Sequence, residues 1–324
     1  MPLLEIEDLS VGFHTERGMA RVVDDLSFTV EAGRIVGLVG ESGCGKSVTA
    51  RAIMRLLPCP PAMIEGRKIA LDGHDLLALD ERAMRDVRGN RIGMIFQEPM
   101  TSLNPTFPVG FQIGETLRLH RKLGSAAIRK RVLELLGMVG IGAPERRFAQ
   151  YPHELSGGLR QRVMIAMALA CHPKLLIADE PTTALDVTIQ AQILELLVRL
   201  RDELGKAILL ITHDLGVVAE YADEVIVMYA GKLAEWADVR GLFHKPRHPY
   251  TLGLLGSMPR LAGPIGKLAG PLPTIPGTVP SPLARPPGCP FAGRCPRAIG
   301  RCNEAFPPLA RHGRHGFACW NPVP

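Results

Sequence analysis

Short apolar runs alternate with longer amphipathic segments along the first 245 residues of the chain. Ile35–Val39 is the clearest run, and its continuous apolar character, ending at Gly40, is typical of a buried parallel strand. Asp186–Leu204 repeats apolar residues on one face and predicts a helix, capped by Asp186 and ended by Gly205. Strands that alternate with helices predict an α/β fold built on a parallel sheet. The further strands are expected at Arg91–Phe96, Leu175–Ala178, Ala207–Thr212 and Val225–Tyr229.

Other segments add to this pattern. The alternating residues Leu4–Glu7 and Leu26–Val30 predict half-buried strands of an antiparallel sheet. A helix is expected over Lys46–Leu57, where Pro58 stops it. Between about residues 98 and 162 the pattern is mostly helical, which predicts a helical insertion in the α/β domain. Its clearest helical segments are Ile113–Leu123 and Ala126–Val139.

The sequence changes character after Lys245. Seventeen of the 28 prolines lie in residues 246–324, together with nine Lys and Arg residues but one acid, Glu304. The formal charge of +6 therefore comes from this tail, because the first 245 residues carry a balance of −2. We expect two parts, a domain over residues 1–245 and a C-terminal extension over residues 246–324.

The overall composition is that of an ordinary globular protein, with 46% hydrophobic and 22% charged residues in a chain of 324. No apolar run approaches the roughly 18 residues that a membrane-spanning helix needs. The first ten residues are acidic and alternating, unlike a secretory signal. We therefore expect a protein that stays in the cytoplasm, where its seven cysteines are not expected to form disulfides.

A phosphate-binding motif follows the first buried strand. The residues from Gly40 to Ser47 read Gly-Glu-Ser-Gly-Cys-Gly-Lys-Ser and fit the pattern G-x-x-x-x-G-K-[ST] between a predicted strand and a predicted helix. Glycines let the backbone fold around phosphate oxygens, while N–H groups and the helix N-terminus supply positive potential. Lys46 is expected to reach the β- and γ-phosphates, and Ser47 to join the Mg²⁺ shell. The expected nucleotide contacts are Gly40, Ser42, Gly43, Cys44, Gly45, Lys46, Ser47 and Val48.

Cys44 lies inside this motif, near the N-terminus of the predicted helix. A helix N-terminus tends to lower the pKa of a thiol. One hypothesis is that alkylation of Cys44 blocks ATP binding and that bound ATP protects the thiol. The alternative is a small side chain at a permissive position.

Two carboxylates follow the predicted strand Leu175–Ala178. They lie at the carboxyl end of the strand, the edge at which α/β sheets bind ligands. Asp179 is suited to hold Mg²⁺, directly or through water. Glu180 is suited to orient and deprotonate the water that attacks the γ-phosphate. Together with the phosphate-binding motif, this pair predicts an ATPase.

Four further motifs resemble those of the ATP-binding subunits of ABC transporters. Residues 155–162, Leu-Ser-Gly-Gly-Leu-Arg-Gln-Arg, look like the signature motif of that family. Gln97 resembles the Q-loop glutamine, Asp186 the D-loop aspartate and His213 the switch histidine. The resemblance covers about residues 3–240. It implies an α/β P-loop NTPase fold of ABC type with an antiparallel β subdomain and a helical insertion, here followed by a Cys-rich C-terminal extension.

The resemblance also implies a role for each motif. Ser156, Gly157 and Gly158 precede a helical run and would form a second phosphate cradle, which in the family faces the ATP held by the partner subunit. Two ATP molecules would then be buried in a head-to-tail dimer. The remaining implied roles are contact with the γ-phosphate for His213, linkage of the two sites for Asp186, and sensing of Mg²⁺ and the attacking water for Gln97.

Phe13 is the candidate for the aromatic ring that stacks on adenine. The spacing between Phe13 and Gly40 along the chain does not identify this residue uniquely, so the alternative is an ordinary buried phenylalanine.

Two segments point to one branch of the family. Gln97–Pro105 resembles the Q-loop extension of peptide-importer ATPases, and His248–Thr251 resembles the motif that begins their C-terminal extension. The resemblance implies an ATPase that energises import of di- or oligopeptides, bound at the cytoplasmic face of the cell membrane. Its partners would be two membrane permease subunits, a second similar ATPase and, through the permeases, an external substrate-binding protein. Nickel importers share much of this pattern and are the alternative.

Four cysteines crowd into the last 36 residues: Cys289, Cys295, Cys302 and Cys319. Four thiolates can hold Zn²⁺ or a [4Fe–4S] cluster, but none of these spacings is the tight knuckle usual in zinc sites. The family tail that they resemble is associated with a [4Fe–4S] cluster, so we expect a cluster first, zinc second and free thiols third. Neighbouring arginines could offset the cluster's charge, namely Arg285, Arg294, Arg297, Arg301, Arg311 and Arg314.

Other functions fit the sequence less well. The basic tail has few aromatic residues and no recognisable nucleic-acid-binding module, so no nucleic acid partner is expected. A non-transport ABC protein of DNA repair or translation typically has long coiled coils or two tandem cassettes, which this sequence lacks. An iron–sulfur sensor with secondary ATPase activity is a third alternative. Replacing Cys295 and Cys302 would separate that sensor from a transporter with a structural cluster.

Overall fold

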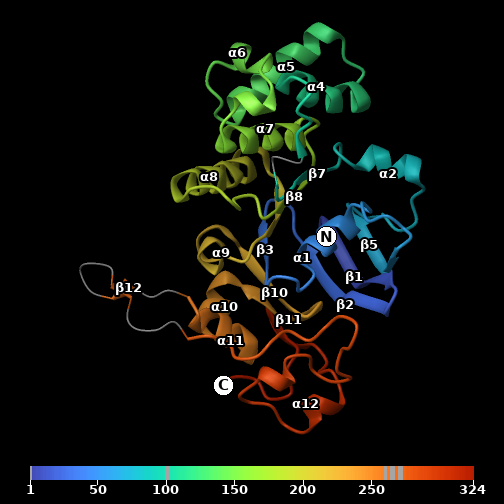
Figure 1. Cartoon of the computed structure of the whole chain (residues 1–324), viewed down its shortest axis with the longest axis vertical. Helices are drawn as coiled ribbons and strands as arrows, with labels where there is room; N and C mark the ends of the chain where they lie inside the picture. Colours follow the sequence, from blue (N-terminus) through green and yellow to red (C-terminus); the bar gives the residue numbers. More distant parts are fainter. Residues whose placement is uncertain (1, 99–101, 259–260, 263–266, 269–272) are drawn as a thin grey trace. The chain divides into compact units, whose positions relative to one another are not determined.

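A computed structural model describes residues 2–98, 102–258, 261–262, 267–268 and 273–324 (Figure 1). The chain divides into two compact units. One comprises residues 1–5, 29–35 and 70–211, and the other comprises residues 6–28, 36–69 and 212–324. The C-terminal extension therefore shares its unit with the phosphate-binding motif.

The first unit is built on three parallel strands, with β8 (Leu175–Asp179) between β7 (Ile92–Ile95) and β9 (Ala207–Ile211). All residues of these strands are buried, as their continuous apolar sequences predict. The helix α8 (Val187–Leu204) follows β8. Its N-cap Asp186 accepts a hydrogen bond from the backbone of Ile189, and Gly205 ends it in a left-handed conformation, so both predicted caps are confirmed.

A group of helices lies between β7 and β8 in the chain (Figure 1). α4 (Val109–His120) packs against α5 (Ser125–Met138), α6 (Pro144–Phe148) and α7 (Gly157–Leu169). Helices are thus confirmed here, but α4 begins before the predicted Ile113. The reason is Pro108, whose fixed φ suits the residue that precedes a first helical turn. The remaining elements of this unit are β6 (His74–Asp75), α2 (Glu81–Val87) and η1 (Pro152–Glu154).

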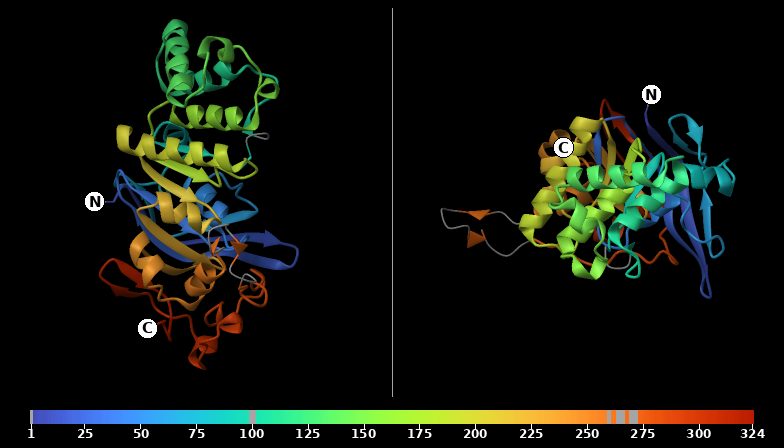
Figure 2. Two further views of the ribbon diagram at one scale, coloured as in Figure 1. Left: turned by 90° about the vertical axis from the view of Figure 1, so that its left-hand side faces the viewer. Right: turned by 90° about the horizontal axis from the view of Figure 1, so that it is seen from above.

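The second unit holds most of β1 (Leu4–Thr15) and β2 (Gly18–Val30), which form a long hairpin (Figure 2). β4 (Ala62–Glu65) pairs with β1 in antiparallel register. The two hairpin strands are longer than predicted. Asp8 and Asp25 have left-handed φ angles of 55° and 53°, which interrupt the alternation of buried and exposed residues that identifies a strand in the sequence.

The second unit also contains strands of a mixed sheet. β10 (Glu224–Tyr229) pairs in parallel with β3 (Ile35–Val39) and in antiparallel with β11 (Lys232–Asp238). The extension adds β15 (His315–Phe317) to β11 and β14 (Ala310–His312) to β15. Its other elements are α10 (Val239–His244), α11 (Pro249–Gly256), β12 (Leu261–Ala262), β13 (Lys267–Leu268), η2 (Ala292–Arg294) and α12 (Arg301–Glu304).

Two helices and a strand complete the list of elements: α1 (Lys46–Ile53), α9 (Leu215–Tyr221) and β5 (Lys68–Leu71), which has two residues in each unit. α1 is shorter than the predicted Lys46–Leu57. Arg55 takes a left-handed φ of 48°, which ends the helix before Pro58 is reached.

Three arginines of the extension form ion pairs with carboxylates of the first 245 residues. Arg285 forms an ion pair with Asp24 at 3.2 Å and Arg294 with Glu41 at 2.9 Å, while Arg314 pairs with Glu224. We expected these arginines to offset the charge of a metal cluster. Three of the six contact carboxylates of the same unit, and a role of the six in offsetting a cluster's charge stays a prediction.

Candidate nucleotide-binding and catalytic site

The phosphate-binding motif forms a loop from β3 to α1, as predicted. Gly40 has a φ of 153°, and a Cβ atom built on it would lie 2.2 Å from the carbonyl oxygen of Met228. Gly45 has a φ of 105° and is the residue that precedes α1. L-amino acids with side chains rarely adopt either conformation. The backbone of the loop therefore requires glycine at both positions.

The side chains of the loop differ in exposure. Lys46 is buried, and its Nζ donates hydrogen bonds to the carbonyl oxygens of Gly40 at 2.8 Å and Glu41 at 3.2 Å. Ser42 and Gly43 are exposed, and Ser47 and Val48 are partly exposed. The loop is suited to bind an anion, because its backbone N–H groups and the N-terminus of α1 supply positive potential. Lys46, the first residue of α1, adds a positive charge there.

Cys44 differs from the expectation. It is 1% exposed, and burial raises the pKa of its thiol, although Lys46 acts in the opposite direction. The expected lowering by the helix N-terminus is wrong, because loss of solvation of the thiolate outweighs the nearby positive charge. Cys44 is therefore the small side chain that fills space beneath the loop, and its Sγ lies 2.8 Å from where a Cβ of Gly40 would stand.

The two predicted carboxylates lie at the end of β8 in the first unit. Asp179 is 1% exposed, and Glu180 follows with a left-handed φ of 47°. Oε2 of Glu180 accepts hydrogen bonds from Nε2 of Gln97 and from Oγ1 of Thr183, each at 3.0 Å. The structure thus brings Gln97 to Glu180, although 83 residues separate them. Thr183 was missed, since a threonine in a turn has no signal of its own in the sequence.

The residues of the signature motif begin α7, also in the first unit. Ser156 is the N-cap of α7, but its hydroxyl does not cap the helix by a hydrogen bond. Ser156 and Gly157 are exposed and Gly158 is partly exposed. A Cβ atom on Gly158 would lie 2.8 Å from Cγ2 of Ile189. The motif therefore presents backbone N–H groups at the N-terminus of a 13-residue helix, an arrangement that suits an anion.

His213 is exposed and directly precedes the N-cap of α9 in the second unit. The carboxylate of Asp214 accepts hydrogen bonds from Gly216 and Val217, and its own N–H donates to Oγ1 of Thr212. These bonds fix the backbone on both sides of His213.

Two other predictions concern Phe13 and the segment Gln97–Pro105. Phe13 lies in β1 opposite Ala62 and is partly exposed, and its contact with adenine stays a prediction. Of the segment Gln97–Pro105, the residues Pro99, Met100 and Thr101 lie outside the described residues.

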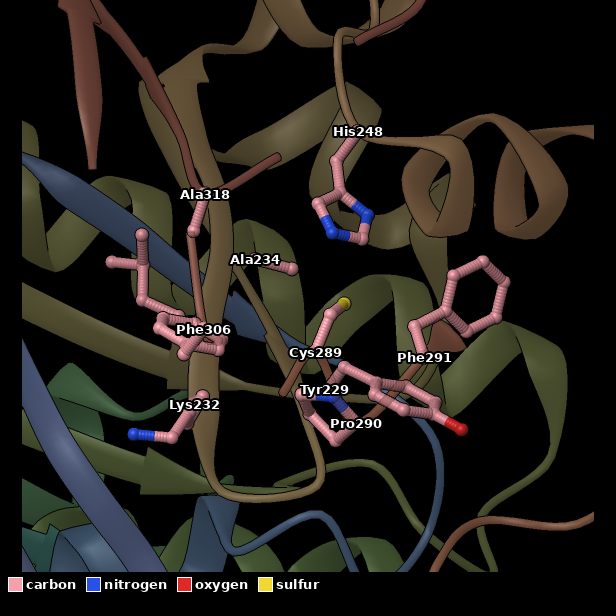
Figure 3. A pocket seen from close by; sticks show the side chains of 10 residues that line it. Tyr229, Lys232, Ala234, His248, Cys289, Pro290, Phe291, Phe306 and Ala318 are labelled. Carbon is pink, nitrogen blue, oxygen red and sulfur yellow. The ribbon is translucent and has the colours of Figure 1, made fainter. Parts of the chain in front are cut away.

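The four cysteines of the extension line one pocket, together with His248 and Trp320 among others. Cys289 and Cys302 are buried, and the backbone N–H of Cys289 donates to the carbonyl oxygen of Cys302 at 2.7 Å. Burial, together with the other three thiols, raises the pKa of Cys289 to about 11. In a neighbouring pocket the ring of His248 and the sulfur of Cys289 point toward one another (Figure 3).

A shared pocket does not by itself make a metal site. A single zinc ion needs all its sulfur ligands about 2.3 Å from one point. Within the described parts of the chain, no three His, Cys, Asp or Glu side chains are arranged to hold a metal ion.

Comparisons with known proteins agree with this geometry. The profile described as "ABC transporter" matches residues 23–183, and that described as "Oligopeptide/dipeptide transporter, C-terminal region" matches residues 234–302. The chain is 54% identical over 319 residues to the probable peptide ABC transporter ATP-binding protein y4tR of Sinorhizobium fredii, covering 98% of this chain and 94% of that protein. It is 51% identical to the dipeptide transport ATP-binding protein DppD of Bacillus subtilis, with the same coverage. The chain belongs to the ABC transporter family.

This ABC protein also resembles solved structures. A post-hydrolysis dimeric structure of the ATP-binding cassette MJ0796, bound to ADP and Pi, matches with a TM-score of 0.66 and 29% identity over 74% of this chain and 99% of that one. The fold is therefore that of an ABC ATPase cassette, α/β with antiparallel and mixed sheets. Membership of the family identifies the chain as an ATPase.

Proposed function

We propose that this chain is the ATP-hydrolysing subunit that energises import of di- or oligopeptides through a membrane permease complex. The observation that carries the proposal is the match of nearly the whole chain, including the extension, to peptide-transport ATP-binding proteins. The match of residues 234–302 favours peptides over nickel, because it concerns the C-terminal region named for oligopeptide and dipeptide transporters.

In this proposal the phosphate loop binds ATP through the residues Gly40, Ser42, Gly43, Cys44, Gly45, Lys46, Ser47 and Val48, with Phe13 against the adenine. Mg²⁺, when bound, would neutralise phosphate charge, and Ser47, Gln97 and Asp179 are the residues proposed to hold it. The hydroxyl, carboxylate and amide carbonyl oxygens of these three side chains are ligands that suit a hard cation. Glu180 accepts the proton of the attacking water, and Gln97 orients that carboxylate through the hydrogen bond at 3.0 Å.

Dimerisation completes the proposed site. Ser156, Gly157 and Gly158 of one subunit bind the γ-phosphate held by the phosphate loop of the other, while His213 contacts the same phosphate and Asp186 links the two sites. Support comes from the dimeric state of the similar cassette MJ0796 and from the exposed N-terminus of α7. The dimer partner is a second, similar ATPase.

The proposed location is the membrane surface, in complex with two permease subunits and, through them, with an external substrate-binding protein. Among the helices of the described residues, none has the length and apolar character that a membrane crossing requires. We assign ATP binding to residues 1–245, with a helical subdomain at about 98–162, and the peptide-importer extension to residues 246–324.

The [4Fe–4S] cluster on Cys289, Cys295, Cys302 and Cys319 is part of the proposal, with a structural role and with zinc as the runner-up. Its support is that the four thiols line one pocket and that cysteine sulfur is the usual ligand of iron–sulfur clusters. Protein purified without oxygen is expected to contain about four iron and four sulfide ions per chain. Stoichiometric zinc, or no metal, would contradict the cluster.

Uptake by cells tests the transport function. A strain that lacks the chain should lose uptake of labelled di- and oligopeptides and keep uptake of nickel. The wild-type chain should restore peptide uptake and Glu180→Gln should not. Loss of nickel uptake with intact peptide uptake would overturn the proposal.

A further inference from the structure

Glu41, the second residue of the phosphate loop, is held by two residues of the C-terminal extension. Its backbone N–H donates a hydrogen bond to Oη of Tyr250 at 2.9 Å. Its carboxylate accepts one from Nη1 of Arg294, also at 2.9 Å. These residues lie 209 and 253 positions further along the chain, and all three belong to the second unit.

The guanidinium of Arg294 is fixed from several sides. Nε donates to the carbonyl oxygen of Pro276 at 2.8 Å and Nη2 to that of Ile275 at 3.1 Å, while Nη1 also reaches Oη of Tyr229 at 3.1 Å. The side chain is 8% exposed. A planar, multiply bonded guanidinium in a buried position is an oriented charge rather than a mobile one.

Tyr250 is equally constrained. It is fully buried, and its ring packs against Tyr229 and Phe291 with centroids 4.6 and 5.4 Å away. Its backbone N–H donates to Nδ1 of His248, which lies at the start of α11. Burial raises the pKa of the Tyr250 hydroxyl, so it stays protonated and neutral beside the loop. The loop therefore rests on an aromatic cluster that the extension supplies.

The contacts of Glu41 matter for phosphate binding because of where its negative charge lies. Glu41 is next to Gly40, whose carbonyl oxygen already accepts from Lys46, and it is a negative charge in a loop that binds anions. Without a cation beside it, the carboxylate would repel phosphate and compete for Lys46. Arg294 neutralises that charge through its ion pair with the Glu41 carboxylate.

We infer that Arg294 and Tyr250 are positioning residues for the phosphate loop, through which the extension sets the affinity of the cassette for the phosphate groups of a nucleotide. The inference rests on nucleotide binding by Gly40–Ser47. It assigns to the extension a direct role in nucleotide binding, in addition to any role of its cysteines. Arg294 directly precedes Cys295, so the wall of the cysteine pocket and the support of the loop are the same segment of chain.

Equilibrium titration of the full chain with a non-hydrolysable ATP analogue tests the inference. Arg294→Ala is expected to weaken binding about tenfold, since a hydrogen bond to a charged group is lost and a carboxylate is left unpaired. Arg294→Lys keeps the charge but loses the planar guanidinium with its several N–H donors. Its affinity should lie between those of Arg294→Ala and wild type. Tyr250→Phe, which keeps the ring, should weaken binding by about threefold.

A double variant tests whether Arg294→Ala weakens binding through the unpaired charge of Glu41 or through a general loss of structure. Glu41→Ala combined with Arg294→Ala should bind within about threefold of wild type, because the unpaired carboxylate is gone. The defect of Arg294→Ala alone should also shrink as salt rises, since salt screens the repulsion. A double variant as weak as Arg294→Ala would overturn the inference.

Arg297→Ala is the matched control. Arg297 also lies beside Cys295, but it donates to Asn321 and Pro322 and not to the loop. Its substitution should leave affinity within twofold of wild type, and an equal loss in both arginine variants would contradict the inference. Lys46→Ala reports on the site itself. If Lys46→Ala abolishes binding while Arg294→Ala binds like wild type, the inference fails and the nucleotide site stands.

Discussion

The phosphate loop and the four-cysteine pocket belong to the same unit, but they are built in different ways. The loop consists of eight consecutive residues whose backbone angles, such as φ of 153° at Gly40 and 105° at Gly45, determine which residues are tolerated. The pocket collects side chains from His248 to Trp320, brought together by packing against a buried aromatic cluster. In the loop, geometry is local, whereas in the pocket it depends on the tertiary fold.

This difference between the loop and the pocket determines how far function depends on single residues in each region. In the nucleotide machinery, single atoms have roles that no neighbour can take over, such as Oε2 of Glu180, which accepts from both Gln97 and Thr183. In the extension, contributions are shared among many contacts, including the pairing of Arg285 with Asp24 and of His315 with Glu235. Single substitutions should therefore have sharp effects in the first region and graded effects in the second.

The largest effect is expected for Glu180→Gln. The amide keeps the shape of the side chain but cannot accept a proton, so ATP hydrolysis should fall by about 10²–10⁴-fold. ATP binding should change little. Phosphate release measured alongside nucleotide titration checks both expectations.

Thr183→Ala is the control for that experiment. It removes the other hydrogen bond to the same oxygen but leaves the carboxylate, and we expect a fall in hydrolysis of less than about tenfold. A Glu180→Gln variant that hydrolyses ATP as fast as Thr183→Ala would show that Glu180 is not the base.

The next effect concerns Gly40→Ala. The new Cβ would approach the carbonyl oxygen of Met228 to 2.2 Å, so the loop must move and nucleotide affinity should fall by more than about tenfold. Gly43→Ala offers a matched comparison, since Gly43 also has a positive φ, of 79°, but nothing lies within 4 Å of the new atom. The loss of nucleotide affinity in Gly43→Ala should be smaller than in Gly40→Ala. Equal losses in the two variants would mean that backbone strain, and not the close approach to β10, limits the loop.

The same distinction between local and tertiary geometry explains what the sequence could predict. The strand Ile35–Val39, the helix capped by Asp186 and the loop itself have local signals, and all are confirmed. The contacts of Glu41 with Tyr250 and Arg294 have none, because they join residues more than 200 positions apart.

The strands of the extension were missed for a related reason. β14 and β15 have three residues each. They are stabilised by the pairing of β15 with β11 and of β14 with β15, and not by a pattern of their own. The low pKa expected for Cys44 was wrong because the sequence shows its proximity to a helix but not its burial. Burial of a single small side chain depends on tertiary packing.

Cysteine labelling measures that burial. Cys44 is 1% exposed with a raised pKa, whereas Cys59 is exposed. At pH 7.5 an alkylating reagent should therefore modify Cys59 at least about tenfold faster than Cys44, and raising the pH should increase the rate at Cys44 because the thiolate is the reactive form. Mass spectrometry of peptides from timed samples gives the two rates. Denatured protein, in which the difference should largely disappear, is the control, and comparable rates in the folded protein would contradict the burial of Cys44.

The smallest effect on hydrolysis is expected for Cys302→Ser in the extension. Cys302 is 6% exposed, so a hydroxyl placed there loses solvation, and the free energy of unfolding should fall by about 2 kcal/mol. The rate of ATP hydrolysis at 25 °C should nevertheless stay within about twofold of wild type, because the contacts of Arg294 and Tyr250 with Glu41 do not involve this side chain. Denaturant unfolding and phosphate release on the same sample test the two statements, with Cys171→Ser, also buried, as the control outside the extension. A large loss of hydrolysis at unchanged stability would show that the cysteine pocket itself, and not the loop support beside it, acts on the nucleotide.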